Sequence, residues 1–368
     1  MNMKANIVTV AGIILSSFLI LHPAFGQGAL TPPGAPAPTM KSLAQIEPRT
    51  PISSAPYIIT NPGSYYLTTN VTVNFGNGIT ISANDVSLDL NGFTIFSTQY
   101  PAQSTYGIFL NAVTNVTIAN GFIRGGVTNN GSGVYGGSGF GTGIAPNNIV
   151  PNNTHVYGIS VFGCLYRGIT GCTVVESCTV QTVGGDGIDA TSVVKDSSAV
   201  DCGGDGIDGE EVFNSRGYSA GTGNGLFSTV AENCYGYAAG SGYGLLATST
   251  LNCYGISLES STGLRATVAQ NCYGVCEGNF GPGLSAYIAQ DCYGLCNSVN
   301  PNGVGLYAYG SAIGCYGYCA DGGIGLTAYT AAYCVGDCLG GTAISVTVGN
   351  GCVGRAGTNY VIYKYNMP

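Results

Sequence analysis

The sequence predicts an all-β protein, a right-handed parallel β-helix of about a dozen coils with roughly 19 residues in each coil. Three observations predict this fold. The tetrapeptide NCYG or a close variant recurs at 233–236, 252–255, 271–274, 291–294 and 314–317, glycine fills 60 of the 368 positions, and only 8% of the residues are charged. A period of about 20 residues without helical spacing is typical of a solenoid, whose short units must stack on their neighbours to bury a core.

The composition excludes several classes of protein. Hydrophobic residues make up 45% of the chain, too many for a disordered protein. The charged fraction of 8% lies far below the roughly 25% of typical soluble domains, which argues against a coiled coil or a helix bundle. A net charge of −8 and only two histidines argue against a nucleic-acid partner and against a histidine-rich metal site.

Residues 1–26 have the pattern of a secretory signal peptide. Lys4 precedes an apolar run at 7–21, and Ala24 and Gly26 fit a cleavage site. The run is shorter than the roughly 20 residues of a membrane-spanning helix. We therefore expect a secreted protein, extracellular, at the cell surface or periplasmic, with no membrane span after cleavage. Residues 27–52 are rich in proline and predict a leader or linker before the β-helix at 53–368.

The repeats predict ladders of identical side chains. Paired strands lie about 4.8 Å apart, so the same position in successive coils forms a column along the solenoid. A Gly-Ile or Gly-Leu pair lies nine or ten positions before each NCYG position and predicts an inward column, with small residues two positions later. The two inward columns contain Ile169, Ile188, Ile207, Leu226, Leu245, Leu264, Leu284, Leu306, Leu326 and Ile344, and then Ala247, Ala266, Ala286, Ala308 and Ala328.

The less regular N-terminal part adds a resemblance to a known group. The segments GSYYLT, GITI, VSLDLNGFTI, GIFL and NVTIANGFIRGG, at roughly 41–125, look like the opening coils of secreted bacterial right-handed parallel β-helix repeat proteins of the pectin-lyase-like fold. The resemblance implies the fold. It does not imply one function, because that fold carries polysaccharide lyases, glycoside hydrolases, tailspikes, adhesins and proteins without catalysis. No catalytic signature of those families is present, so no catalytic residue is transferred.

Charge concentrates in the duplicated hexapeptide GGDGID at 184–189 and 203–208. The offset of one coil stacks Asp189 on Asp208, and it stacks Asp186 on Asp205 in a column that begins with Arg167 one coil earlier and ends with Asn224 one coil later. Carboxylates about 5 Å apart repel unless they share a proton, pair with a cation or bind a metal.

Three interpretations of this acidic cluster stay open. Aspartates are common in GGDG turns, so they can be solvated corner residues. A calcium site is the second interpretation, with the ligands Asp186, Asp189, Asp205, Asp208 and Glu210. The third is a catalytic site for polysaccharide cleavage, formed by Asp186, Asp205, Asp189, Asp208 and Arg167. Calcium is the one cofactor that the sequence suggests.

The cysteines form two columns, offset from each other by four positions. The first column contains Cys234, Cys253, Cys272, Cys292, Cys315, Cys334 and Cys352, and the second contains Cys276, Cys296, Cys319 and Cys338. The first interpretation is a stack of free thiols that pack as small hydrophobic groups. The second is disulfides within or between coils, with the candidates Cys272, Cys276, Cys292, Cys296, Cys315, Cys319, Cys334 and Cys338. Metal binding is least favoured, because neither a CxxC pair nor partner histidines accompany the columns.

A tyrosine follows most cysteines of the first column. These residues are Tyr235, Tyr254, Tyr273, Tyr293 and Tyr316, and a further column contains Tyr287, Tyr309 and Tyr329. If the cysteines point inward, strand alternation places the first tyrosine column outward. Such a strip can bind sugar rings or another protein, or it can serve packing alone.

Two hypotheses of function follow. The first is a non-catalytic secreted or cell-envelope protein, whose rigid surface binds polysaccharides or envelope components, with the first tyrosine column as the ligand-binding site. The second is a polysaccharide lyase or glycoside hydrolase that uses the acidic cluster.

Overall fold

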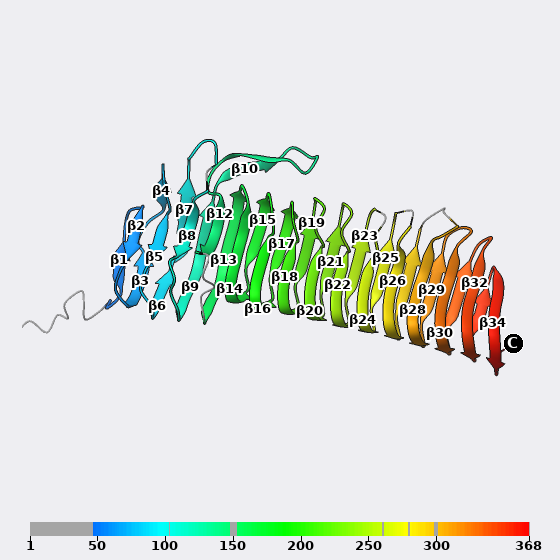
Figure 1. The fold of residues 1–368 in the computed structure, drawn as a ribbon. Coiled ribbons are helices and arrows are strands. Elements are labelled where there is room, and N and C mark those ends of the chain that lie inside the picture. Colours follow the sequence, from blue (N-terminus) through cyan, green and yellow to red (C-terminus); the bar gives the residue numbers. More distant parts are fainter. Residues whose placement is uncertain are drawn as a thin grey trace, which may run out of the picture. The chain divides into compact units, whose positions relative to one another are not determined.

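The structure, a computed structural model, describes residues 47–102, 104–147, 153–259, 261–278, 280–297 and 301–367. Arg49–Pro368 form one compact unit, whose described residues are strands and turns without a helix (Figure 1). The predicted signal peptide and most of the predicted leader lie outside the described residues. The strand β1 (Thr50–Ile52) already pairs with the next coil, ahead of the predicted start of the β-helix at 53.

The unit is a parallel β-solenoid, as the sequence predicts, and its strands form three faces. Early strands of face 1 are β2 (Tyr57–Ile59), β5 (Ile79–Ile81), β8 (Tyr106–Leu110) and β12 (Thr142–Pro146); those of face 2 are β1, β3 (Gly63–Leu67) and β6 (Val86–Asp89); those of face 3 are β4 (Val71–Val73) and β7 (Thr94–Ser97). Two longer strands, β9 (Val116–Arg124) and β13 (Thr154–Cys164), continue from face 2 into face 3.

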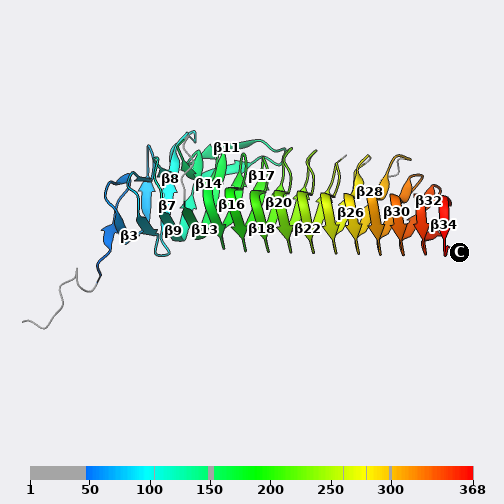
Figure 2. The ribbon, with the colours of Figure 1, turned by 60° about the horizontal axis from the view of Figure 1, so that its bottom comes forward.

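From residue 167 onward the coils are regular, and two strands make each coil (Figure 2). The longer strand bends from face 1 into face 2: β14 (Arg167–Glu176), β16 (Ile188–Lys195), β18 (Ile207–Phe213), β20 (Leu226–Glu232), β22 (Leu245–Leu251), β24 (Leu264–Gln270), β26 (Pro282–Gln290), β28 (Val304–Ile313), β30 (Ile324–Ala332), β32 (Thr342–Asn350) and β34 (Thr358–Tyr365). Face 3 holds β15 (Thr179–Val183), β17 (Ser198–Cys202), β19 (Arg216–Ser219), β21 (Tyr235–Ala238), β23 (Tyr254–Ser257), β25 (Tyr273–Cys276), β27 (Tyr293–Cys296), β29 (Tyr316–Cys319), β31 (Val335–Cys338) and β33 (Val353–Arg355).

The described residues form about 16 coils, more than the dozen that the sequence predicts. The difference arises near the N-terminus, where successive coils have unequal lengths. Leu88 pairs with Ile118, and Ile118 pairs with Val156. Both of these steps along the chain are longer than the step from Val156 to its partner Val175, where the regular coils begin. A search for one fixed period therefore counts the regular coils and misses several early ones.

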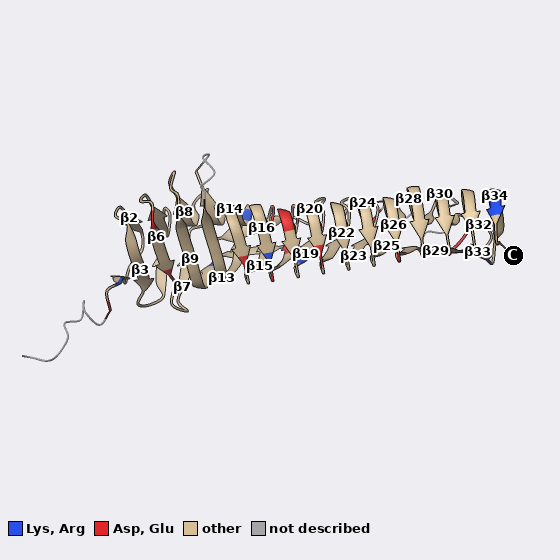
Figure 3. Ribbon diagram, turned by 90° about the horizontal axis from the view of Figure 1, so that it is seen from below, with Lys and Arg blue, Asp and Glu red and all other residues tan. Residues whose placement is uncertain are grey.

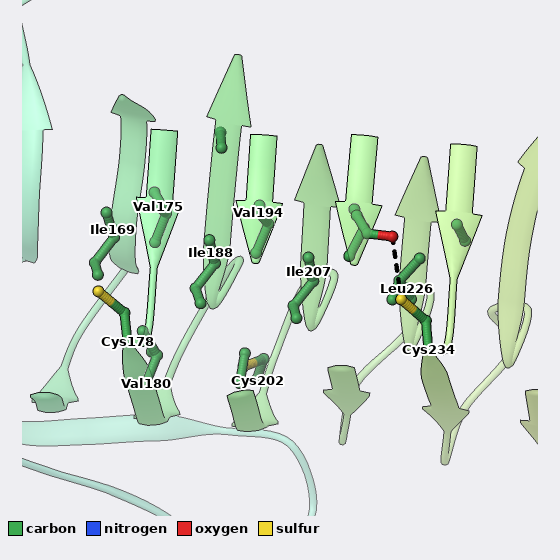
Figure 4. Close-up of a cluster of buried hydrophobic side chains, with 14 of the residues drawn as sticks. Ile169, Val175, Cys178, Val180, Ile188, Val194, Cys202, Ile207, Leu226 and Cys234 are labelled. Carbon is green, nitrogen blue, oxygen red and sulfur yellow. Dashed lines mark hydrogen bonds between the residues drawn. The ribbon is translucent and has the colours of Figure 1, made fainter. Parts of the chain in front are cut away.

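The two predicted inward columns form the core. Every member of the Ile/Leu column is fully buried, from Ile169 to Ile344, and each pairs in register with the next (Figure 4). Burial of one such side chain contributes roughly 1.5–3 kcal/mol, so the column is a main source of stability. In the alanine column four members are buried and Ala266 is partly buried, as alternation along the strand requires.

The turn from face 2 to face 3 explains the first letter of NCYG. The residue before the inward cysteine has a left-handed backbone, with φ of 54° at Asn233 and at Asn252. Asparagine tolerates this conformation better than most side chains. The amides also form a ladder, because Asn252 Nδ2 donates to Asn233 Oδ1 at 3.1 Å and Asn233 Nδ2 donates to Asn214 Oδ1 at 3.2 Å.

A hairpin leaves the solenoid between β9 and β12. It consists of β10 (Gly126–Asn129) and β11 (Tyr135–Ser138), and in Figure 1 it extends along the neighbouring coils. The Tyr135 hydroxyl and Asn129 Nδ2 donate to the Asp201 carboxylate on β17, at 3.0 and 2.7 Å. These contacts fasten the hairpin to a later coil of the solenoid. Within the described residues no helix is long and apolar enough to span a membrane.

Candidate functional site

The predicted column Arg167, Asp186, Asp205 and Asn224 forms at the corner between faces 3 and 1. Arg167 Nε pairs with Asp186 Oδ2 at 3.1 Å. Asp186 Oδ1 accepts the backbone N–H of Asp205 at 3.0 Å, and Asp205 Oδ1 accepts the backbone N–H of Asn224. Burial raises the pKa of Asp205 although Asn224 donates to it. Asp186 and Asp205 thus each accept a backbone N–H at the corner of the next coil, and they are half-buried corner residues rather than fully solvated ones.

The second predicted pair lies outward on face 1. Asp189 and Asp208 are register neighbours on β16 and β18, and Thr170 Oγ1 donates to Asp189 Oδ2 at 2.8 Å. Partial burial, and then the neighbouring Asp189, raise the pKa of Asp208 to about 6. Glu210 and Glu211 follow on β18 and are exposed. Figure 3 shows charged positions concentrated over β14–β20 and spread more thinly over the later coils.

These acids are not arranged as a metal site. Among the described residues, no group of three or more histidine, cysteine or acidic side chains is placed to hold a metal ion. Asp186 and Asp205 turn their oxygens toward backbone N–H groups, while Asp189 and Asp208 lie on the neighbouring face. Calcium binding stays a prediction, and a binding measurement decides it.

The first tyrosine column lies outward on face 3, as alternation predicts. Neighbouring rings from Tyr235 to Tyr316 lie at centroid distances between 4.7 and 5.3 Å. The two ring pairs from Tyr273 to Tyr316 are stacked, and the two from Tyr235 to Tyr273 are tilted. The guanidinium of Arg216 covers the Tyr235 ring at 5.0 Å, and the Tyr316 hydroxyl donates to Asp337 at 3.1 Å. Rings at these distances partly cover one another's faces, and each tyrosine is half-buried. The column offers a row of ring edges and hydroxyls, and its role in ligand binding stays a prediction.

The cysteines point into the core, and all 15 are free and buried. Figure 4 shows Cys178, Cys202 and Cys234 directed inward beside the Ile/Leu column. Cys234 Sγ donates to the carbonyl of Glu232 at 3.1 Å, and Ser197 Oγ makes the matching bond to Lys195 at 2.7 Å. Serine and cysteine therefore serve the same purpose in this column, which is to satisfy the carbonyl two positions earlier at the turn.

A groove that the sequence does not predict lies at the bend between faces 1 and 2. It has a volume of about 390 Å³ and follows the coils from β20 to β28. Its walls are formed by Phe227, Ser228, Thr229, Leu246, Ala247, Thr248, Arg265, Ala266, Thr267, Tyr287 and Tyr309. We call these residues the bend groove. Tyr287 and Tyr309 are 57% and 56% exposed, so both present ring surface to the groove and to solvent.

Polar side chains line the bend groove. Ser228 also borders it, but Ser228 is the register neighbour of Ala247 in the inward column and is only 5% exposed, so its hydroxyl faces the core. Arg265 Nη1 donates to the Tyr243 hydroxyl at 2.7 Å, which holds the guanidinium at the groove wall. Thr229, Thr248 and Thr267 are exposed at equivalent positions and supply a row of hydroxyls.

The bend groove and the acids of face 1 form one continuous surface. The outward column of face 1 contains Asp189, Asp208, Phe227, Leu246 and Arg265, each paired in register with the next. Gly209, between Asp208 and Glu210, is the register neighbour of Ser228. The acids therefore adjoin the N-terminal end of the groove. In the sequence, the column of Tyr287, Tyr309 and Tyr329 indicates this groove. The preceding coils have threonines at the equivalent position.

Comparison of the chain with family models, with curated proteins and with solved structures found no match. The fold and its repeated surfaces define the class, a parallel β-solenoid with about 19 residues in each regular coil. The resemblance of residues 41–125 to pectin-lyase-like proteins gains no support from these comparisons.

Proposed function

We propose that the protein is a non-catalytic polysaccharide-binding solenoid, and that the glycan lies along the bend groove. One observation carries the proposal: the exposed rings of Tyr287 and Tyr309 and a row of exposed threonines share one open groove. Glycan sites combine aromatic surface with hydroxyl partners, because a sugar ring has an apolar face and a polar rim. Export is part of the proposal, because residues 1–26 have the pattern of a signal peptide.

Tyrosine variants test the groove. Tyr287→Ala combined with Tyr309→Ala removes the exposed rings, and we expect affinity for the bound glycan to fall about tenfold. Isothermal titration of the purified full chain against a polysaccharide panel measures this. The matched control is Tyr360→Ala with Tyr363→Ala, exposed tyrosines on β34. Equal affinity of groove variant and control, or no glycan binding at all, contradicts the proposal.

A second candidate function is polysaccharide cleavage. The pKa of Asp208, raised to about 6 beside Asp189, favours it, because one acid that stays protonated next to an ionised one can act as a proton donor. Retaining glycoside hydrolases use a carboxyl pair about 5 Å apart. Asp189→Asn with Asp208→Asn must then abolish the release of reducing ends or unsaturated products. If the parent protein binds the glycan but releases no cleavage products, the result supports the binding function and contradicts cleavage.

A further inference from the structure

We infer that a second site, on face 3, binds a linear glycan that carries phosphate or sulfate ester groups. The site is an open hollow with a volume of about 430 Å³ on β9, β13, β15 and β17. We call it the face 3 hollow, and it is lined mainly by Arg124, Ser160, Phe162, Thr179, Gln181 and Ser198. The inference goes beyond the proposed function, because it assigns another ligand to other coils and another face.

The hollow forms where small side chains interrupt a row of large ones. Phe122, Ser160, Thr179, Ser198 and Arg216 are register neighbours on successive coils, and the first tyrosine column continues the same row. The serines and the threonine leave space above the sheet between the Phe122 ring and the Arg216 side chain. Because the strands pair in register, this space runs along the solenoid and suits an extended ligand.

A guanidinium group lies at each end of the hollow, and an aromatic ring rather than an acid holds each one. The Arg124 guanidinium covers the Phe122 ring at 5.6 Å from its centroid, and that of Arg216 covers the Tyr235 ring at 5.0 Å. Among the described residues, neither arginine lies in an ion pair and no acid lines the hollow. Both arginines therefore keep N–H donors for an anion, which a guanidinium binds through paired hydrogen bonds.

Neutral hydrogen-bonding groups occupy the space between the two arginines. The side chains of Ser160, Thr179, Gln181 and Ser198 make no hydrogen bond to another residue in the described part of the chain. A phosphate or sulfate ester has more acceptor oxygens than a carboxylate, so it can use more of these donors. The hydroxyls and the Phe162 ring also suit the polar rim and the apolar face of a sugar. Together these groups indicate an esterified glycan rather than a single small anion.

The hairpin of β10 and β11 borders the hollow at the corner between faces 3 and 1. It begins at Gly126, two positions after Arg124, and it is fastened to Asp201, which follows the lining residue Val200. Figure 1 shows the hairpin extended along these coils. A rim on this side directs a ligand along the solenoid rather than across it.

The register sets the length that the ligand must cover. The rung that holds Arg124 and the rung that holds Arg216 are four steps apart, through Ser160, Thr179 and Ser198. Four spacings of about 4.8 Å give about 19 Å. Oligomers that carry ester groups over this length reach both guanidinium groups, so they should bind more tightly than shorter ones.

The experiment titrates the purified full chain with four dextran oligomers that share one backbone: neutral, phosphorylated, sulfated and carboxymethylated. Isothermal titration should give tighter binding of an ester form than of the carboxymethylated and neutral forms. The comparison of the phosphorylated with the sulfated oligomer identifies which ester the site prefers.

Two variants test the hollow in different ways. Arg124→Gln with Arg216→Gln removes both guanidinium groups and should weaken binding of the ester form about tenfold. Thr179→Tyr fills the hollow without a change of charge and should also weaken binding about tenfold, while the fold survives because tyrosine occupies the same row from Tyr235 onward. The control is Arg355→Gln with Lys364→Gln, which removes the same charge from exposed positions on the last coils and should preserve the affinity.

The outcomes separate this inference from the proposed function. Equal binding of the neutral or carboxymethylated oligomer, or no binding of either ester form, overturns the inference and leaves the bend groove untouched. The inference is also overturned if the arginine variant binds as tightly as its control. A loss of ester binding in the Tyr287→Ala, Tyr309→Ala variant alone places the ligand in the bend groove instead. Oligothymidylate that binds as tightly as the ester forms, with the same loss in the arginine variant, assigns the hollow to nucleic acid and overturns the inference. Thermal unfolding of each variant confirms that it is folded.

Discussion

At the scale of single residues, the positions that repeat do so for different physical reasons. The cysteine of NCYG fills the core, the tyrosine stacks outward, and the asparagine supplies a left-handed turn. The inward and outward roles follow from alternation and could be predicted from the sequence. The asparagine role could not, because a left-handed turn is a property of the backbone path that periodicity alone does not reveal.

Tyr333 occupies the same left-handed position as these asparagines, with φ of 55°, and its side chain is 69% exposed. A left-handed backbone costs roughly 1–2 kcal/mol for an ordinary side chain, and less for asparagine. We expect Tyr333→Asn to raise the free energy of unfolding by about 1 kcal/mol, measured by denaturant titration. Tyr329→Asn, on a regular strand, is the control. If Tyr333→Asn instead lowers the free energy of unfolding, packing of the Tyr333 ring contributes more to stability than the left-handed backbone costs.

Asp208 predicts a dependence of stability on pH. Its pKa is about 6 in the folded chain and near 3.8 without the fold, so folding favours its protonated form. The contribution of protonated Asp208 to the free energy of unfolding is fully present below pH 3.8 and is lost as the pH rises through 6. Asp208→Asn should therefore gain stability over the parent between pH 4 and pH 7, by about 1 kcal/mol after allowance for solvent exposure. Thermal unfolding across this range tests it, and a difference that does not change with pH contradicts it.

At the scale of elements, glycine sets how closely two faces approach. A Cβ on Gly236, on face 3, would collide with the carbonyl oxygen of Gly244 at the start of face 1. Corner glycines could be expected from the sequence, since they precede each strand. Their second use, a close contact between backbones of two faces, could not, because it depends on how far the coil is flattened. The bend groove could not be predicted for the same reason, because it forms only where the strands bend from face 1 into face 2.

Gly236→Ala tests the close contact. We expect a loss of roughly 2–4 kcal/mol in the free energy of unfolding, because the new methyl group must displace backbone atoms of the adjoining face. Gly136→Ala is the matched control, since it lies on β11 with no atom within 4 Å of the added carbon. Denaturant titration of both variants measures the difference. If Gly236→Ala costs no more than the control, the two faces are not in contact.

The cysteine columns predict a simple pattern of reactivity. All 15 thiols are buried, so the folded chain should react slowly with a thiol reagent. After denaturation without reductant, all 15 thiols should react, because the structure holds them free. A sample reduced first is the control. A lower count without reductant places disulfides among the candidates from Cys272 to Cys338.

At the scale of the solenoid, each coil contacts mainly its two neighbours, so stability should be nearly a sum over coils and their interfaces. Deletion of residues 234–252 removes one whole coil and joins Asn233 to Cys253, the register equivalent of Cys234 on the following coil. We expect this variant to keep its β-sheet circular dichroism and a cooperative transition at a slightly lower temperature, because every remaining ladder stays in register. Deletion of 234–242 alone places face 1 residues on face 3 and should prevent folding. Failure of the whole-coil deletion to fold would mean that the coils depend on contacts beyond their nearest neighbours.

The whole-coil deletion also removes Leu246 and Thr248, so the bend groove loses one rung. Affinity for long glycans should therefore fall while the fold survives.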